Sequence, residues 1–533
     1  MTTKKVLILA AGRGTRMGDY AETTHKALLP LGHKAILTRI FEQFTAQHEF
    51  IISVGHKADH IRSYVELAHP NLRVQYVEVD RFDGPGSGPG YSAYCARDLL
   101  HEPFYLTCAD TLWSEPLNDQ GNWLGTFKVS EEESRHYCNL EIDGRRGTAI
   151  VNKKSVKPEN HRAFIGLAHI KDWAHFFAGL AGDSKSKECE LLAGFEAIIK
   201  NSTLESHEIN SWLDVGRFEL YQAAREKMAL DCFEKRDEFI YFAEGRVIKF
   251  FADDRIVRDR VERSRMNTSV FPKIIGQRAH FYSYDFEPGV NFYQAYSVER
   301  FSRLLNWLRD TLWQPVEVRR EERIENGLKF YYEKTYQRVA NFLKNNPNFN
   351  SAGSVQGHFC ESAADLLRNI QWHELTNIEA TFIHGDLQFA NIIYREKTDS
   401  FKLIDWRHDF GGAKAFGDLY YDFAKLYSGL LVDLEQVRAG HFKFNESVQA
   451  IEFSLPMLAQ KTELISILRK FVEAAGFNWA KIELLSGLIF LNMAGLHRGP
   501  LDKIFFCLGR QMLSDLQSAA ASNRPVTPQP RPN

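Results

Sequence analysis

Apolar and polar positions along the first half of the chain follow the order strand, turn and helix. The segment KKVLILAAGRGTRM (residues 4–17) is a continuous apolar run that ends in Gly-Arg-Gly. FIISVGHKADHIRSYV (residues 50–65) repeats this order, and the apolar run in FYLTCADTLW (residues 104–113) delivers Asp110 at its end. Short apolar runs followed by helical spacing indicate buried strands joined by helices. The first half is therefore predicted to be an α/β domain.

The pattern changes near residue 230, where a charged helical stretch gives way to alternating apolar positions. EFIYFAEGRVIKFF (residues 238–251) predicts a pair of strands, and a charged helix is expected after it. From about residue 298 onward helical spacing dominates, with one exception.

The exception is FIHGDLQFANIIYREKTDSFKLIDW (residues 382–406), in which two apolar runs flank the polar bridge REKTDS. Apolar runs on both sides of a short polar bridge predict a β-hairpin. The turn before it carries Asp386 and Asn391, and the second run ends in Asp405. Asp405 is therefore expected at the tip of a strand, where its carboxylate is accessible to a metal ion.

A chain of 533 residues exceeds one ordinary hydrophobic core, so two or three domains are expected. We divide it into a first domain (1–230), a small lobe rich in strands (231–297), a helical lobe (298–520) and a tail (521–533). The tail is Pro-rich and polar and is predicted to be disordered.

Composition and charge narrow the class of protein. Hydrophobic residues make up 44% of the chain and charged residues 25%, as in folded soluble proteins. The net charge of −2 gives no sign of a nucleic-acid or anionic-membrane partner. The longest apolar run, LLSGLIFLNMAGL (residues 484–496), is too short to span a bilayer and is predicted to be a buried helix. Seven cysteines without a Cys-x-x-Cys pair indicate reduced thiols in a cytoplasmic protein and argue against structural zinc.

The Gly-Arg-Gly turn after the first strand is a candidate phosphate-binding loop, because a strand, a Gly-x-Gly turn and a helix bring backbone N–H groups to an anion. Ala11, Gly12 and Gly14 are the expected contacts of a nucleotide, and Arg16 adds positive charge. The third glycine of the dinucleotide fingerprint is missing, and Met17 occupies its neighbourhood. A dinucleotide loop and an ordinary turn both stay open at this point.

Two histidines in GHKADHI, His56 and His60, have the i, i+4 spacing that can bind a metal ion on a helix. No third histidine or cysteine stands beside them in the sequence. A solvated helix start is therefore the preferred interpretation.

LAAGRGTRM together with HKALLPL resembles the sugar-nucleotide pyrophosphorylase family of nucleotidyltransferases. The resemblance implies a Rossmann-like domain with a mixed sheet. It also implies that a substrate phosphate attacks the α-phosphorus of a nucleoside triphosphate and releases pyrophosphate. In that reaction Lys26 would draw in the attacking phosphate and Arg16 would steady the pyrophosphate. Asp110 and Asp214 would hold Mg²⁺.

The chain departs from the sugar-specific members of that family at GPGSGPGYSAYCARDLL (residues 84–100), where the glycines could wrap a nucleobase or relax a loop. GSGPGYSAY and HKALLPLGHKAILTRI resemble the branch that makes CDP-activated phospho-alcohols, as the bacterial phosphocholine cytidylyltransferases do. This resemblance implies CTP as the nucleoside triphosphate.

In the second half, HGDLQFAN followed by LIDW resembles the choline kinase and aminoglycoside phosphotransferase family, which has a protein-kinase-like α+β architecture. The resemblance implies that Asp386 orients or deprotonates an acceptor hydroxyl. Asn391 and Asp405 would hold Mg²⁺ against the triphosphate of ATP. Lys249 would bind the α- and β-phosphates of ATP, held in place by Glu262.

This second resemblance covers roughly residues 235–515. No Gly-rich kinase loop precedes Lys249, since FAEG is all that stands there, and Asp259 lies near Glu262 on the same helix. Asp418 and Asp422 resemble the acidic segment that braces the catalytic loop in the family, and a structural role is expected for both.

Together the two halves predict a bifunctional enzyme that phosphorylates a small alcohol with ATP and then transfers a nucleotidyl group to the phosphorylated product. Choline is the leading acceptor, because a quaternary ammonium favours aromatic walls and 13% of the chain is aromatic; ethanolamine or another amino alcohol is a close second. The product would serve the decoration of surface polysaccharide or lipid. Two alternatives stay open: a sugar kinase joined to a sugar-1-phosphate nucleotidyltransferase, and one active half regulated by an inactive one. The oligomeric state is not indicated.

Overall fold

The computed structural model describes residues 4–45, 47–183, 189–228, 236–447 and 450–522. The chain forms two compact units. The first contains residues 1–230, 234–254 and 275–286, and the second contains 231–233, 255–274 and 287–533. Most of the predicted disordered tail (521–533) lies outside the described residues.

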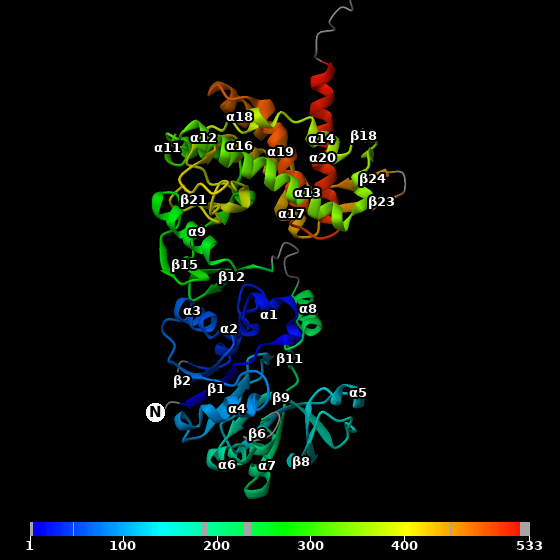
Figure 1. Cartoon of the computed structure of the whole chain (residues 1–533). Helices are drawn as coiled ribbons and strands as arrows, with labels where there is room; N and C mark the ends of the chain where they lie inside the picture. The colour runs from blue at the N-terminus through cyan, green and yellow to red at the C-terminus, as the bar shows by residue number, and fades with distance from the viewer. Residues whose placement is uncertain (1–3, 46, 184–188, 229–235, 448–449, 523–533) are drawn as a thin grey trace, which may run out of the picture. The chain divides into compact units, whose positions relative to one another are not determined.

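A nine-stranded sheet in the order β3-β2-β1-β4-β9-β6-β10-β8-β7 forms the centre of the first unit (Figure 1). β1 pairs in parallel with β2 and β4, whereas β9 is antiparallel to β4 and β6, so the predicted mixed sheet is confirmed. The strands are β1 (Lys4–Ala10), β2 (His48–Val54), β3 (Val74–Glu78), β4 (Phe104–Cys108), β6 (Asn122–Phe127), β7 (Cys138–Asp143), β8 (Arg146–Asn152), β9 (His161–Ile170) and β10 (Leu204–Glu208).

Both faces of this sheet are buried, which explains the continuous apolar run of the first strand. Val6 and Ile8 of β1 belong to one hydrophobic core, and Leu7 and Leu9 belong to the other. The first core receives α2 (Ile36–Phe41), α3 (Ala58–Ala68) and α8 (Phe218–Lys227), and the second receives α4 (Pro89–Cys95), α6 (Trp173–Asp183) and α7 (Leu192–Asn201). α1 (Asp19–Thr23) and α5 (Glu131–Ser134) are short.

A second sheet of the first unit has the order β12-β13-β15-β14 and packs against the N-terminal residues. Tyr241 of β12 shares the core of α3, and its hydroxyl donates to Leu28 O at 2.7 Å. The backbone N–H of Phe242 donates to His33 O at 2.7 Å. The units therefore cut across the predicted small lobe (231–297). The strands are β12 (Glu238–Ala243), β13 (Arg246–Phe251), β14 (Ile274–Gln277) and β15 (Phe281–Asp285).

The same packing changes the interpretation of the histidines at the start of α3. The His60 ring lies 4.6 Å from that of His280 and 5.6 Å from that of Phe250, both in or beside the second sheet. Burial lowers the pKa of His60 to about 3. The predicted solvated helix start is therefore wrong for His60, because strands remote in sequence cover it.

The second unit contains the predicted hairpin, in which β20 (Ile392–Arg395) pairs antiparallel with β21 (Ser400–Leu403). Its core is helical, and α16 and α19 pack closely. α19 contains most of the predicted buried apolar run, and its Asn492 donates to Thr335 Oγ1 at 2.9 Å. The helices of eight or more residues in the described part of this unit are α9 (Asp254–Met266), α11 (Val298–Thr311), α12 (Arg320–Gly327), α13 (Lys334–Asn345), α16 (Leu419–Leu431), α18 (Lys461–Ala474), α19 (Trp479–Ala494) and α20 (Leu501–Ser522).

Short elements complete the second unit. They are β16 (Val290–Asn291), β17 (Gly353–Val355), β18 (His358–Cys360), β19 (Ala380–Thr381), β22 (Gly417–Asp418), β23 (Lys443–Glu446), β24 (Ala450–Ser454), α10 (Phe292–Ala295), α14 (Ala363–Arg368), α15 (Trp372–Leu375) and α17 (Leu434–Arg438). Across the described parts of the chain, we find no helix with the length and apolar character needed to cross a membrane.

Replacing Tyr241 by Phe deletes the hydroxyl that bonds the fully buried Leu28. The unfolding free energy should fall by about 1–2 kcal/mol, because a buried carbonyl loses its donor. Scanning calorimetry of the full chain measures this loss of stability as a lower midpoint temperature of one unfolding transition. Tyr332→Phe, at a side chain that is 40% exposed, is the matched control. Equal midpoints for both variants would contradict the assigned bond.

Candidate active sites

The loop after β1 is tied to the segment that carries Lys26. Gly14 has φ +67°, and a Cβ there would lie 3.4 Å from Lys26 Cβ. His25 Nδ1 accepts from Ala27 N at 3.1 Å, so Nε2–H is left to donate to Gly12 O at 3.2 Å. Burial, and then the nearby Lys26, lowers the pKa of His25 to about 3, which keeps the ring neutral for both bonds. The imidazole of His25 thus holds the glycine loop beside Lys26.

Lys26 meets Asp110, which follows the end of β4. Lys26 Nζ lies 2.5 Å from Asp110 Oδ2, and each side chain is 15% exposed. Burial alone would raise the pKa of Asp110, but the positive charge of Lys26 and then of Arg16 outweighs it, and the pKa falls below its usual value. The structure therefore brings these three predicted residues together.

Asp214 joins this group through a short two-stranded sheet. β11 (Leu213–Asp214) pairs antiparallel with β5 (Thr111–Leu112), directly after Asp110. A Cβ on Gly216 would lie 2.7 Å from Asp110 Oδ2 and 3.2 Å from Asp214 Oδ1, so both carboxylates converge on this glycine. Burial raises the pKa of Asp214, and the negative charge of Asp110 adds to this effect. A hydrogen bond from Gly216 N–H acts in the opposite direction.

The donor set fits Mg²⁺. Two carboxylates share a confined space, and burial, together with the charge of Asp110, raises the pKa of Asp214, so a bound cation would stabilise the ionised form of both. Among the described residues no three His, Cys, Asp or Glu side chains form a metal cage. A pair of carboxylates is nevertheless enough for Mg²⁺, which keeps waters and takes its other ligands from substrate phosphates.

Aromatic side chains that the sequence analysis did not single out border Asp214. The Tyr137 hydroxyl donates to Asp214 Oδ2 at 3.1 Å. The Trp212 ring lies 5.2 Å from that of Tyr137 and 5.4 Å from that of Phe127. Tyr137 directly precedes β7, far from the motifs, and no local signal marks it.

Close packing explains why two positions of the Gly-rich loop at residues 84–90 are glycines. A Cβ on Gly88 would clash with Cys189 O, and one on Gly90 would clash with Glu190 O. Cys189 N–H donates to Ser87 O at 2.9 Å, and Gly90 N–H donates to Cys189 O at 2.8 Å. These two glycines let a remote segment approach the loop.

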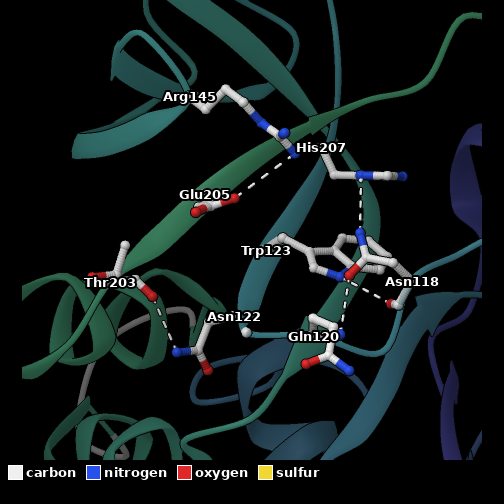
Figure 2. A pocket seen from close by; sticks show the side chains of 9 residues that line it. Asn118, Gln120, Asn122, Trp123, Arg145, Thr203, Glu205 and His207 are labelled. Carbon is white, nitrogen blue, oxygen red and sulfur yellow. Dashed lines mark hydrogen bonds and ion pairs between the residues drawn. The ribbon is translucent and has the colours of Figure 1, made fainter.

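A polar hollow of about 310 Å³ lies at the end of the main sheet that is remote from Asp110 (Figure 2). It opens where β6 and β10 begin, whereas Asp110 follows the end of β4, which runs parallel to β6. Trp123 forms one wall and donates to Asn118 O at 3.1 Å. None of the predicted site residues lines this hollow, so its size does not mark the reaction centre.

In the second unit, the buried carboxylate of Asp422 holds the HGD turn. It accepts the backbone N–H of His384 and of Gly385, each at 2.8 Å, and the indole N–H of Trp313 at 3.0 Å. Burial raises the pKa of Asp422 to about 6 in spite of these bonds and of nearby Arg263. These contacts agree with the structural role expected for Asp422.

Asp386, Asn391 and Asp405 lie on one continuous hydrogen-bonded segment. Asn391 Nδ2 donates to Asp386 O at 2.8 Å and to Asp386 Oδ2 at 3.2 Å. The backbone N–H of Ile404 donates to Asn391 O at 2.9 Å, which places Asp405 next to the turn. Asp405 has φ +59°, a strained conformation for a residue with a side chain, as functional residues often have.

Charged partners flank these acidic side chains. Lys425 Nζ lies 2.6 Å from Asp386 Oδ1, and Arg260 lies 3.6 Å from Asp405 Oδ1. The amide oxygen of Asn391 and the carboxylate of Asp405 are oxygen donors of the kind Mg²⁺ prefers. The residues present therefore fit a metal held against a polyphosphate.

The remaining residues of the kinase resemblance lie away from the HGD turn in sequence. Lys249 lies on β13 and is 1% exposed. Glu262 of α9 forms an ion pair with Lys414 at 2.5 Å, which Asp259 joins at 3.5 Å. The pairing of Glu262 with Lys249 stays a prediction. Asp418 is fully buried and accepts the Tyr331 hydroxyl at 2.9 Å, as a structural residue does.

Residues 6–116 match the family described as the MobA-like NTP transferase domain. The N-terminal region is a nucleotidyltransferase domain. The match begins in β1, contains the loop, Lys26 and Asp110, and ends before Asp214.

The curated proteins and solved structures named below match a larger share of the chain, 39% to 42%. GlmU, a bifunctional protein of Methanococcus maripaludis (strain C5), is 25% identical over 219 residues, which cover 39% of this chain and 51% of that one. The chain thus spans about half the length of the GlmU proteins that it matches. The UTP–glucose-1-phosphate uridylyltransferase AglF of Haloferax volcanii is 22% identical over 238 residues, 42% of this chain and 96% of that one.

Among solved structures, a UDP-glucose pyrophosphorylase with UDP-glucose has a TM-score of 0.38 at 22% identity and covers 42% of this chain and 98% of its own. The CTP:phosphocholine cytidylyltransferase LicC of Streptococcus pneumoniae has a TM-score of 0.34 at 19% identity, with 42% and 99% covered.

Gly216→Ala should weaken divalent metal binding in the first unit about tenfold, because the new methyl group would displace the Asp110 carboxylate. Titration of Mn²⁺ with the full chain, followed by water-proton relaxation, measures the affinity. Gly353→Ala, where a Cβ meets nothing within 4 Å, is the control. Unchanged Mn²⁺ affinity in Gly216→Ala would argue against a metal held by this carboxylate pair.

Asp422→Asn places an amide N–H where the carboxylate accepts three donors, and the unfolding free energy should fall by about 1–3 kcal/mol. The wild-type advantage should shrink as pH rises from 4 to 6. Between the ordinary pKa of 3.8 and about 6, the folded state holds the proton of Asp422 more tightly than the unfolded state does. Denaturation of both proteins across this range measures the difference. A pH-independent difference would refute the buried, protonatable carboxylate.

Proposed function

We propose that the chain is a bifunctional transferase. The second unit phosphorylates the hydroxyl group of a small alcohol with ATP. The first unit then transfers a nucleotidyl group from a second nucleoside triphosphate to that phosphate and releases pyrophosphate. The convergence of Lys26, Asp110 and Asp214 beside the glycine loop carries the nucleotidyl-transfer half of the proposal.

In the first unit the acceptor's phosphate oxygen forms a bond to the α-phosphorus, and the bond to the β-phosphate bridge breaks with its electrons on pyrophosphate. Backbone N–H groups of Gly12 and Gly14 receive the triphosphate, and Lys26 steers the incoming phosphate. Arg16 balances charge on the leaving group. A bound Mg²⁺, held by Asp110 and Asp214, supplies further charge neutralisation.

In the second unit the acceptor oxygen forms a bond to the γ-phosphorus of ATP, and ADP leaves with the electrons of the broken bond. Asp386 takes the hydroxyl proton, and its contact with Lys425 orients the carboxylate. Asn391 and Asp405 would hold Mg²⁺, which neutralises the phosphates when bound. Lys249 would contribute to ATP binding. The order of the two steps follows from chemistry, since the product of the second unit is a phosphate ester of the kind that the first consumes.

Two versions of the substrates have support. The motif resemblance favours CTP with phosphocholine or a related amino-alcohol phosphate. One curated relative, the UTP–glucose-1-phosphate uridylyltransferase AglF, favours a sugar phosphate with UTP. Pyrophosphate release from a panel of four nucleoside triphosphates, each with phosphocholine and with glucose 1-phosphate, separates the versions. Turnover with neither acceptor would count against both.

Asp386→Ala should reduce ATP-dependent phosphorylation of the acceptor by at least about 100-fold, since a general base typically contributes 10²–10⁴-fold. Pyrophosphate release from a supplied phosphorylated acceptor should stay within a factor of two. Asp110→Asn is the reciprocal control and should show the opposite pattern. Parallel loss of both activities in either variant would mean that the two sites are not chemically separate.

A further inference from the structure

The predicted catalytic carboxylate of the second unit is surrounded by cations. Lys334 and Arg338 lie four residues apart on α13, so they share one face of that helix. Arg407 follows the hairpin and packs its side chain against Gly385, next to Asp386. Lys425 contacts Asp386 from α16 at 2.6 Å. Two helices and the segment after the hairpin thus bring four positive charges to one place.

The effect of these groups on one another's pKa agrees with this placement. Burial, and then Arg407, Arg338 and Lys425, lowers the pKa of Lys334 well below its usual value. The pKa of Arg338 is lowered in the same way, by burial and then by Arg407, while Asp386 partly restores it. Neither side chain is freely solvated.

Carboxylates do not balance this charge. Within the described residues, Lys334, Arg338 and Arg407 form no ion pair with an acidic side chain, and the carboxylate of Asp386 is shared with Lys425. The negative charge of Asp409 partly restores the pKa of Lys334. The carboxylate oxygens of Asp409, however, contact His408 Nε2 at 3.1 Å and Gly412 N–H at 2.7 Å. Enclosed cations without an ion-pair partner are costly, and such cations are typical of places where an anion binds.

The aromatic faces beside the site are already covered by cations. Lys334 Nζ lies 3.1 Å from the Phe330 ring centre and 5.3 Å from that of Tyr421. The Arg407 guanidinium lies 4.9 Å from the Phe330 ring centre. A quaternary ammonium such as that of choline would have to displace these groups while facing their repulsion.

We propose that the alcohol phosphorylated at Asp386 carries a negatively charged group, a carboxylate or a phosphate, which Lys334, Arg338 and Arg407 bind. This inference rests on the proposed phosphotransfer and replaces choline as its acceptor. An anion among these side chains would form bidentate bonds with guanidinium groups and leave the hydroxyl free to reach Asp386. The reaction is unchanged: the hydroxyl oxygen bonds to the γ-phosphorus, its proton goes to Asp386, and ADP leaves.

The experiment compares acceptors of matched size with the full chain, ATP and Mg²⁺. Glycerate and glucuronate carry a carboxylate, glycerol 3-phosphate carries a phosphate, glycerol and glucose are neutral, and choline and ethanolamine are cationic. At least one anionic probe should have a kcat/KM for ADP formation tenfold or more above its neutral analogue. The carboxylate and phosphate arms identify which anion is preferred. Preference for choline, or turnover in which no anionic probe exceeds its neutral analogue, would overturn the proposal while leaving the phosphotransfer intact.

Arg338→Met tests the assignment to the acceptor rather than to ATP. It should raise KM for the preferred anionic probe at least tenfold and change KM for ATP less than twofold, and Arg338→Lys should recover part of the loss. Lys344→Met, at an exposed position of the same helix, is the control and should change neither. A larger effect on ATP than on the acceptor would overturn the proposal, because the cations would then serve the nucleotide.

Calorimetric titration separates failure of this inference from failure of the proposed function. The full chain, saturated with Mg²⁺ and a non-hydrolysable ATP analogue, is titrated with glycerate, glucuronate and glycerol 3-phosphate. Binding that Arg338→Met abolishes, without turnover of any alcohol, would uphold the anion site and reject phosphotransfer. Absence of binding by all three anions would reject the anion site, whatever the turnover.

Discussion

Lys26 and Asp110 stand 84 residues apart in sequence, and their 2.5 Å contact exists only because β1 and β4 are neighbours in the sheet. The glycine loop follows one of these parallel strands and Asp110 follows the other, so both reach the same edge of the sheet. Lys26 lowers the pKa of Asp110 against the effect of burial, and the carboxylate stays ionised inside the protein. Asp214, the predicted metal pair and the approach of a triphosphate all depend on this arrangement.

In the second unit, a different carboxylate holds the loop that carries the predicted site residues. The buried Asp422 holds the HGD turn by accepting the backbone N–H groups of His384 and Gly385. Asp386, Asn391 and Asp405, the residues proposed for the chemistry, follow along the same part of the chain. The surrounding cations then bear on what binds there, because an enclosed excess of positive charge favours an anionic acceptor over a cationic one.

The strands at residues 238–285 link the sequence regions of the two activities. The resemblance assigns Lys249 on β13 to the ATP site of the proposed kinase. Yet β12, its neighbour, bonds Leu28 and His33, which follow Lys26 in the sequence. The first unit therefore takes structural support from a segment that sequence analysis assigned to the other half, and residues of this segment belong to its hydrophobic core.

Local patterns determined much of what could be foreseen. Continuous apolar runs predicted the buried parallel strands, the polar bridge REKTDS predicted the hairpin, and the loop and Lys-Ala-Leu-Leu-Pro segment indicated the nucleotidyltransferase domain. These features depend on neighbouring residues, since strand burial, turn geometry and phosphate loops are encoded over a few positions. The roles of His25, Tyr137 and Arg338 were missed, because each acts through a partner that is remote in sequence or has no motif of its own. Only the tertiary structure decided where β12–β15 pack and how four separate cations gather at Asp386, because burial and summed charge depend on every segment that folds around a site.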